Sequence, residues 1–254
     1  WSFPREPEAL ATFFAAQTAR IAPLIAAMSP DSFRALPRCA DPVARVAGEL
    51  IGASITAAAL SQPDLAASLI FAMPEIALVH GLYPRAVYGL SMSAVVLTGV
   101  LQDLPLGARC VELVYAARST EGLLLAGALH TGNLAGQLVH PDLAFVHAQW
   151  RDVPEIGFRE GAITHSEVSQ VVLPAARMGA GARLSSCPIP TAPWRDSIAG
   201  QSAPAFRAVH RLLTSADVAD VRGAIRRIAA LPASSPMTRV IVLGSAAFAA
   251  AHLG

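Results

Sequence analysis

The sequence predicts an α/β fold with a parallel sheet, and three observations lead to this prediction. Residues 88–93 (Tyr-Gly-Leu-Ser-Met-Ser) lie between a short apolar stretch and a helix-like run, which is the pattern of a strand-to-helix turn bearing a nucleophile. Between residues 121 and 189, apolar runs alternate in the order βαββαβ, which is typical of the ferredoxin-like unit. The apolar run at 239–244 has the length and composition of a buried strand.

These patterns divide the predicted fold into two subdomains. Residues 1–120 and 190–254 are expected to form a large, hydrolase-like subdomain with the parallel sheet. Residues 121–189 are expected to form a small ferredoxin-like subdomain, inserted into the large one.

Prolines and acidic residues mark where helices of the first 120 residues begin. Asp41-Pro42 pairs a capping carboxylate with a proline at the first helical position. Pro63-Asp64 opens a second helix toward His80, with Pro74 as a candidate kink. The helices expected in this part lie at 7–28, 42–60, 63–80, 94–102 and from a turn at 104–105 to about residue 118.

From residue 121 onward, short apolar runs alternate with helix-like segments. The expected strands are 123–129, 143–149, 155–160, 183–189 and 239–244. The expected helices are 133–139, 164–179, 203–213, 215–231 and a final stretch of small residues.

The composition excludes several classes of function. The chain has no lysine, which excludes a Schiff-base lysine, a pyridoxal anchor and a P-loop. A net charge of +1 without a basic run gives no field that attracts nucleic acid. Cys39, Cys110 and Cys187 have neither metal-type nor disulfide-type spacing, which favours a reducing cytoplasm. The uncharged stretches 86–102 and 122–141 contain too many polar residues for membrane spans, so we expect a cytoplasmic protein without membrane contact.

Ser91 is the candidate nucleophile of the predicted turn. Its small neighbours Gly89 and Ser93 would let the backbone turn sharply, and the next helix would direct its first N–H groups toward a developing oxyanion. The alternative interpretation is an ordinary turn serine, because Gly and Ser are common in turns.

Four segments together resemble the malonyl-CoA:acyl-carrier-protein transacylase family, which includes the acyltransferase domains of polyketide synthases. The segments are Leu60-Ser61-Gln62-Pro63, Ala66-Ala67-Ser68-Leu69, Gly81-Leu82-Tyr83-Pro84 and Tyr88-Gly89-Leu90-Ser91-Met92-Ser93. A leucine-rich stretch leads from Ser91 to Arg118, as in the family, and residues 121–189 match the family's small subdomain.

The resemblance implies a fatty-acid or polyketide acyltransferase that needs no cofactor and no metal. Ser91 would take an acyl group from an acyl-CoA donor, and the backbone N–H of Met92 would hold the oxyanion. An acyl carrier protein would then accept the group. Arg118 would pair with a malonyl-type carboxylate, and Gln62 would contribute to substrate binding. For Arg118 the alternative is a helix-end arginine that bonds backbone carbonyls or a nearby acid.

The departures from the family pattern leave two alternatives open. Leu90 replaces the elbow histidine, residues 1–30 hold no Gly-Gln-Gly, and the segment 186–191 has proline where the family has its catalytic histidine. A first alternative is therefore a catalytically impaired relative that binds a carrier protein or partner enzyme. A second is a thioesterase-like hydrolase. The sequence does not identify a general base among its histidines, which are 80, 130, 140, 147, 165, 210 and 252; of these, His80 and His210 lie in the predicted large subdomain.

Overall fold

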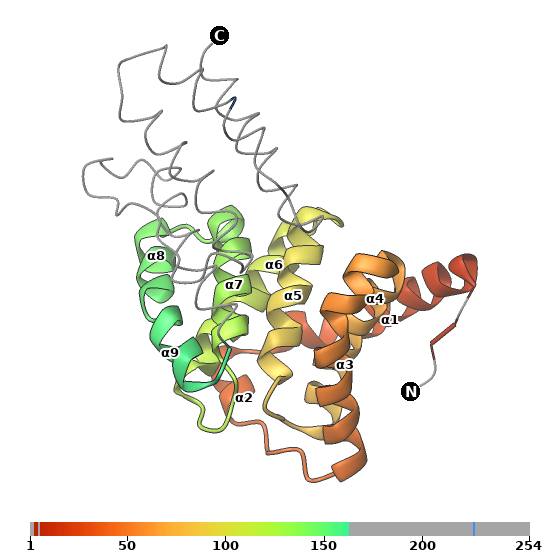
Figure 1. The fold of residues 1–254 in the computed structure, drawn as a ribbon, viewed down its shortest axis with the longest axis horizontal. Coiled ribbons are helices and arrows are strands. Elements are labelled where there is room, and N and C mark those ends of the chain that lie inside the picture. Colours follow the sequence, from red (N-terminus) through yellow and green to blue (C-terminus); the bar gives the residue numbers. More distant parts are fainter. Residues whose placement is uncertain (1–2, 5, 163–225, 227–254) are drawn as a thin grey trace. The chain divides into compact units, whose positions relative to one another are not determined.

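The computed structural model describes residues 3–4, 6–162 and 226, and this described part is built from helices (Figure 1). The chain divides into two compact units, Trp1–Gln149 and Trp150–Gly254. In chain order the helices are α1 (Pro7–Ala27), α2 (Pro30–Arg34), α3 (Pro42–Ser61), α4 (Pro63–His80), α5 (Ala86–Gly99), α6 (Leu104–Ala116), the 3₁₀ helix η1 (Ala117–Ser119), α7 (Ala126–Val139), α8 (Leu143–Arg151) and α9 (Val153–Arg159).

The predicted α/β fold is wrong for this part of the chain. The described residues contain no strand, and their β-type pairing is limited to an isolated parallel bridge between Arg38 and Leu82. The runs 123–129, 143–149 and 155–160, expected as strands, fall largely within α7, α8 and α9. The elements expected beyond residue 162, and with them the division into subdomains, lie outside the described residues.

Residue type and spacing explain why these runs form helices. The run 123–129 consists of leucine, alanine and glycine and has no β-branched residue; leucine and alanine are strong helix formers. In α9 the buried residues Val153, Ile156 and Gly157 follow the three- and four-residue spacing of one helix face. Alternation of buried and exposed residues, which a half-buried strand requires, is absent from α9.

The helix starts predicted at residues 7, 42, 63 and 104 are confirmed, whereas the helix expected at 94–102 begins at Ala86. The Asp41 carboxylate accepts hydrogen bonds from the backbone N–H groups of Val43 and Ala44, at 2.8 and 3.3 Å, and so caps α3. Helix α4 begins at Pro63 and continues past Pro74 to His80. Asp103 caps α6 in the same way, accepting from Leu106 N at 3.1 Å.

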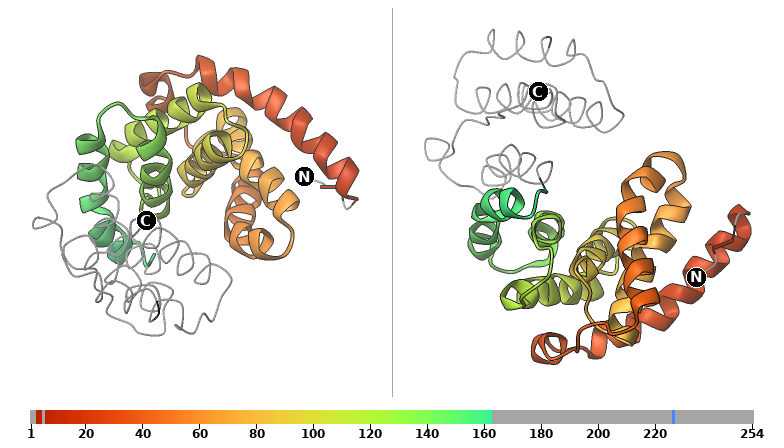
Figure 2. Two further views of the ribbon diagram at one scale, coloured as in Figure 1. Left: turned by 90° about the horizontal axis from the view of Figure 1, so that it is seen from above. Right: turned by 60° about the horizontal axis from the view of Figure 1, so that its bottom comes forward.

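Helix α5 lies at the centre of the first unit. It packs against α4 on one side and α7 on the other, while α6 packs against both α5 and α7 (Figures 1 and 2). Helix α1 crosses α4 and α6, and α3 packs mainly on α4. The residues of α5 are therefore surrounded by other helices, whereas α3 has one principal neighbour.

Two helices, α1 and α4, are long and apolar enough to cross a membrane by length and composition alone. About half of α4 (56% of its most apolar window) is buried inside the bundle, as in the core helix of many soluble proteins, and α1 lies near the N-terminus.

Candidate functional site

Ser91 lies in the middle of α5 and not at a turn. Helix α5 begins at Ala86, so Ser91 is its sixth residue and is followed by eight more helical residues. The side chain is fully buried, and its Oγ donates a hydrogen bond to the Tyr88 carbonyl at 2.8 Å. A serine that bonds the carbonyl three residues earlier has satisfied its hydroxyl locally. The predicted nucleophile would have an exposed hydroxyl, whereas the Ser91 hydroxyl is buried.

The helix packed on Ser91 is α7. A Cβ placed on Gly132 of α7 would lie 3.8 Å from Ser91 Cβ and 3.0 Å from Val114 Cγ1 of α6. The absence of a side chain at Gly132 thus lets α5, α6 and α7 approach closely around Ser91. This close packing accounts for a small residue at position 91.

Gly89 also has a packing role instead of the expected turn role. A Cβ at Gly89 would lie 2.3 Å from Met73 Cβ and 3.0 Å from Pro74 Cδ, both on α4. Gly89 therefore allows the backbones of α4 and α5 to cross at short distance, within a continuous helix.

The backbone N–H of Met92 is directed along the axis of α5. In an α-helix the N–H of residue 92 bonds the carbonyl of residue 88. An oxyanion hole needs N–H groups without intrahelical partners, as at the first turn of a helix. Met92 lies beyond that first turn.

Arg118 and Gln62, the expected substrate-binding residues, lie in separate parts of the first unit. Arg118 is in η1, directly after α6, and its Nη1 donates to Oε1 of Gln149. Gln62 is exposed at the junction of α3 and α4. Among the described residues, Ser91 forms no hydrogen bond with Arg118, Gln62 or any histidine.

Two of the four described histidines, His80 and His140, contact groups other than Ser91. His80 Nδ1 lies 3.8 Å from Oδ2 of Asp41. His140 Nδ1 accepts a hydrogen bond from the Asp142 N–H at 3.0 Å, and its ring stacks on Phe145 with centroids 5.1 Å apart. No three His, Cys, Asp or Glu side chains within the described residues are grouped as metal ligands. His165, His210, His252 and Cys187 lie outside that part of the chain.

A buried polar pair between α6 and α7 was not expected from the sequence. Tyr115 donates from its hydroxyl to Oδ1 of Asn133 at 2.9 Å, and burial raises the pKa of Tyr115. Asn133 is fully buried, and within the described residues its Nδ2 has no hydrogen-bond partner. Asn133 is the single asparagine of the chain, and an asparagine inside an apolar helical run is the one sequence signal of this pair.

The chain matches no protein-family model, no curated protein and no solved structure. The resemblance to acyltransferases thus rests on the short motifs alone.

Proposed function

We propose that this chain is a non-catalytic helical module that binds another protein. The observation that carries this proposal is the placement of Ser91, the candidate nucleophile, inside a helix and under other helices. Attack on a thioester requires an accessible hydroxyl, a general base and an oxyanion site. The local bond to the Tyr88 carbonyl and the direction of the Met92 N–H both favour a structural serine. A thioesterase would require the same groups at Ser91.

The surface supports a binding role. Large hydrophobic side chains that are between 38% and 75% exposed occur on most of the helices. They are Leu24, Val43, Val46, Leu50, Val79, Val100, Leu101, Leu104, Leu134, Leu138, Phe145 and Phe158. Burying one such side chain contributes about 1.5–3 kcal/mol, so clusters of them favour contact with another apolar surface. The net charge of +1 favours a protein partner over nucleic acid.

Incubation with acyl-CoA donors tests the non-catalytic half of this proposal. With malonyl-CoA, acetyl-CoA and a long-chain acyl-CoA, we expect no mass gain on the intact protein and no release of free CoA above buffer, because the Ser91 hydroxyl is buried and bonded. Intact-protein mass spectrometry and a thiol assay measure the two quantities. A mass gain that disappears in Ser91→Ala, or CoA release that this variant abolishes, would instead establish an acyl-serine enzyme.

A further inference from the structure

Helix α3 presents apolar residues on two opposite faces. One face packs into the bundle, and its buried residues are Ala44, Gly48, Ile51, Gly52, Ile55 and Ala58. The opposite face points away from the bundle. It carries Val43, Val46 and Leu50, which are 75%, 52% and 63% exposed, followed by the exposed Ala53 and Ala57. We call these five residues the outer stripe.

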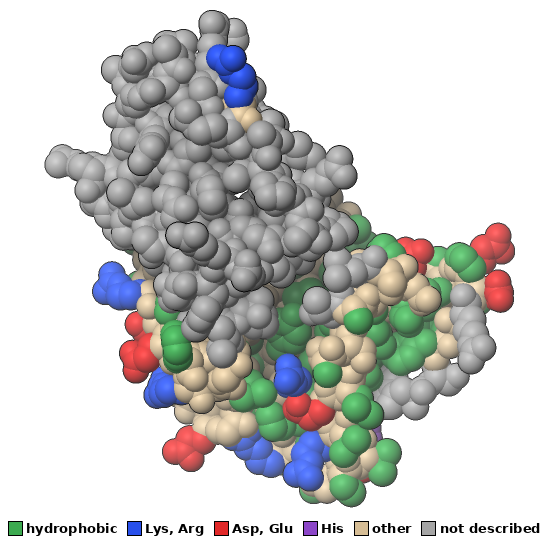
Figure 3. Space-filling model, in the orientation of Figure 1, with side chains coloured by type: hydrophobic (Ala, Val, Ile, Leu, Met, Phe, Trp, Pro, Cys, Tyr) green, Lys and Arg blue, Asp and Glu red, His purple; other side chains and the backbone are tan. Residues whose placement is uncertain are grey.

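The outer stripe has the spacing of a helix–helix seam. Its residues recur at intervals of three, four, three and four, which is the a/d pattern of an antiparallel or parallel helix pair. The pattern occupies the side of α3 opposite its packed face. Hydrophobic side chains are visible along the edge of the molecule over the first turns of α3 in Figure 3.

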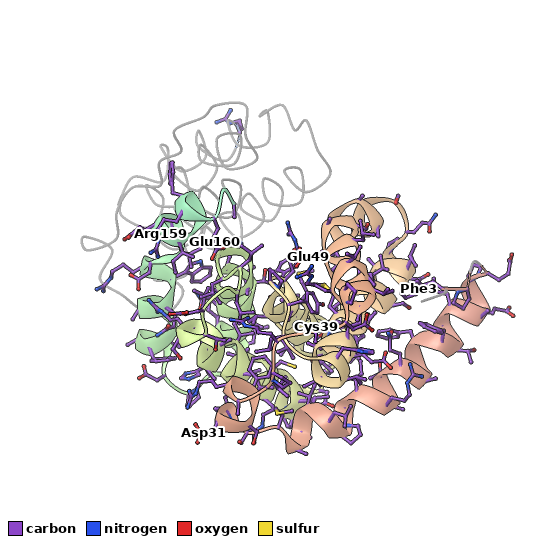
Figure 4. The ribbon with its side chains drawn as sticks, turned by 90° about the horizontal axis from the view of Figure 1, so that it is seen from below. Phe3, Asp31, Cys39, Glu49, Arg159 and Glu160 are labelled. Carbon is purple, nitrogen blue, oxygen red and sulfur yellow. The ribbon has the colours of Figure 1, made fainter. Side chains whose placement is uncertain are left out.

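No charge interrupts the outer stripe. The charged residues of α3 are Arg45 and Glu49. Glu49 accepts hydrogen bonds from the Arg85 backbone N–H and Nε, at 3.1 and 2.9 Å, and is thereby held toward the α4–α5 connection (Glu49 is labelled in Figure 4). Two copies of the stripe can therefore meet without placing like charges in contact.

The order of large and small residues makes the stripe complementary to itself in the antiparallel direction. When Leu50 of one copy faces Ala53 of a second copy, Val46 of the first faces Ala57 of the second. Large side chains then meet small ones at these two pairs, and the two-fold axis repeats each of them. The antiparallel arrangement also brings the exposed Arg45 near the C-terminal end of the second α3, where the helix dipole is negative.

The helix next to α3 also carries an exposed apolar side chain. Val79, in the last turn of α4, is 64% exposed. The residue after it, His80, has its Nδ1 3.8 Å from Oδ2 of Asp41, which caps α3. A contact centred on a helix about 30 Å long is at the small end of specific interfaces, so we expect a weak and concentration-dependent dimer.

We infer that the outer stripe of α3 is a homodimer interface, in which the α3 helices of two copies pack antiparallel with Leu50 against Ala53. This inference names one partner for the proposed binding role and rests on it. The two experiments can fail separately. If the chain is monomeric and transfers no acyl group, the binding role stands but the partner is a different one. If Ser91 is acylated, the chain is an enzyme, and the dimer can still form.

Sedimentation velocity of the full chain tests the interface. Over about 1–200 µM we expect wild type to change from monomer to dimer. Leu50→Glu should remain monomeric across this range, because each dimer would bury two new carboxylates at the seam. Leu138→Glu is the matched control, since Leu138 is 65% exposed on α7 and should leave the dimer intact. Far-ultraviolet circular dichroism verifies that both variants are folded.

Three outcomes of that experiment would overturn the inference. They are a wild type that stays monomeric at 200 µM, a dimer that persists in Leu50→Glu, and a loss of the dimer in both variants. Lipid-vesicle binding by the wild type that Leu50→Glu abolishes would also overturn it, because the stripe would then be a membrane contact.

Crosslinking tests the antiparallel register. Ala53→Cys lies next to the two-fold axis and should yield a covalent dimer with a short bismaleimide. Val43→Cys should not, because the two copies of residue 43 would be about 25 Å apart. Cys39 and Cys110 are buried and Cys187 lies outside the described residues, so wild type, with its three native thiols, measures the background. Equal crosslinking of both variants would indicate a parallel pair. Protection of the introduced thiol of Ala53→Cys in a monomeric chain would indicate a stripe covered by the chain itself. Either result contradicts the inference.

Discussion

Replacing Gly89 by alanine is expected to lower the free energy of unfolding by about 2 kcal/mol, through overpacking between α4 and α5. The new Cβ would lie 2.3 Å from Met73 Cβ, a separation at which the two helices have to move apart. The same substitution at Gly99, in the same helix, is expected to raise the free energy of unfolding by about 0.5–1 kcal/mol. No atom lies within 4 Å of a Cβ at Gly99, so only the helix propensity of alanine acts there.

Urea denaturation of the two variants, followed by circular dichroism, measures both changes. The opposite signs are the informative result, because the two glycines share α5 and differ in their surroundings. If Gly89→Ala proved as stable as Gly99→Ala, Gly89 would not be at a close helix crossing, and the turn expected from the sequence would regain support.

The starts of α3 and α4 were predictable because each is encoded locally. Asp41 and Pro42 lie next to each other in the chain, and the carboxylate that caps α3 needs only the following N–H groups. The same applies to Pro63 at the start of α4. A capping interaction spans three or four residues, so the sequence shows it directly.

The three strands expected between residues 123 and 160 were predicted wrongly because short apolar runs are ambiguous. A run of seven residues such as 123–129 fits a buried strand or a piece of a buried helix, and periodicity alone does not separate them. The presence of Ala and Leu and the absence of Val, Ile and Thr favoured the helix. The predicted ferredoxin-like order depended on that one ambiguous choice, repeated at 143–149 and 155–160.

The turn expected at Ser91 was predicted wrongly for a related reason. Small residues at 89, 91 and 93 suit a tight turn, but they equally suit a helix that other helices approach closely. Which applies depends on partners distant in sequence: Met73 for Gly89, and Gly132 for Ser91. The Tyr115–Asn133 pair depends in the same way on residues 18 positions apart. Such contacts arise only once the helices are packed.

Raising the pH above about 9 is expected to destabilise the protein steeply, because buried acids keep their protons only in the folded state. Burial raises the pKa of the Cys110 thiol to about 12, and burial also raises the pKa of the Tyr83 phenol. Both side chains are almost completely buried, and the Tyr83 hydroxyl donates to the Met73 carbonyl at 3.1 Å. In the unfolded chain, by contrast, a thiol has a pKa of about 9 and a phenol a pKa of about 10.

A folded-state pKa raised above the unfolded value contributes stability that is complete below the unfolded pKa and is lost as the pH rises through the window between the two. Each group therefore removes about 1.4 kcal/mol per pH unit above its unfolded pKa, or together about 4 kcal/mol by pH 11. Urea denaturation at pH 8, 9, 10 and 11 measures this loss. Cys110→Ala, which has no thiol to ionise, should show a shallower decline by about 1.4 kcal/mol per pH unit between pH 9 and 11. If the free energy of unfolding of this variant fell with pH as steeply as that of wild type, the thiol would have the same pKa in the folded and unfolded states. Cys110 would then not be buried away from water in the folded protein.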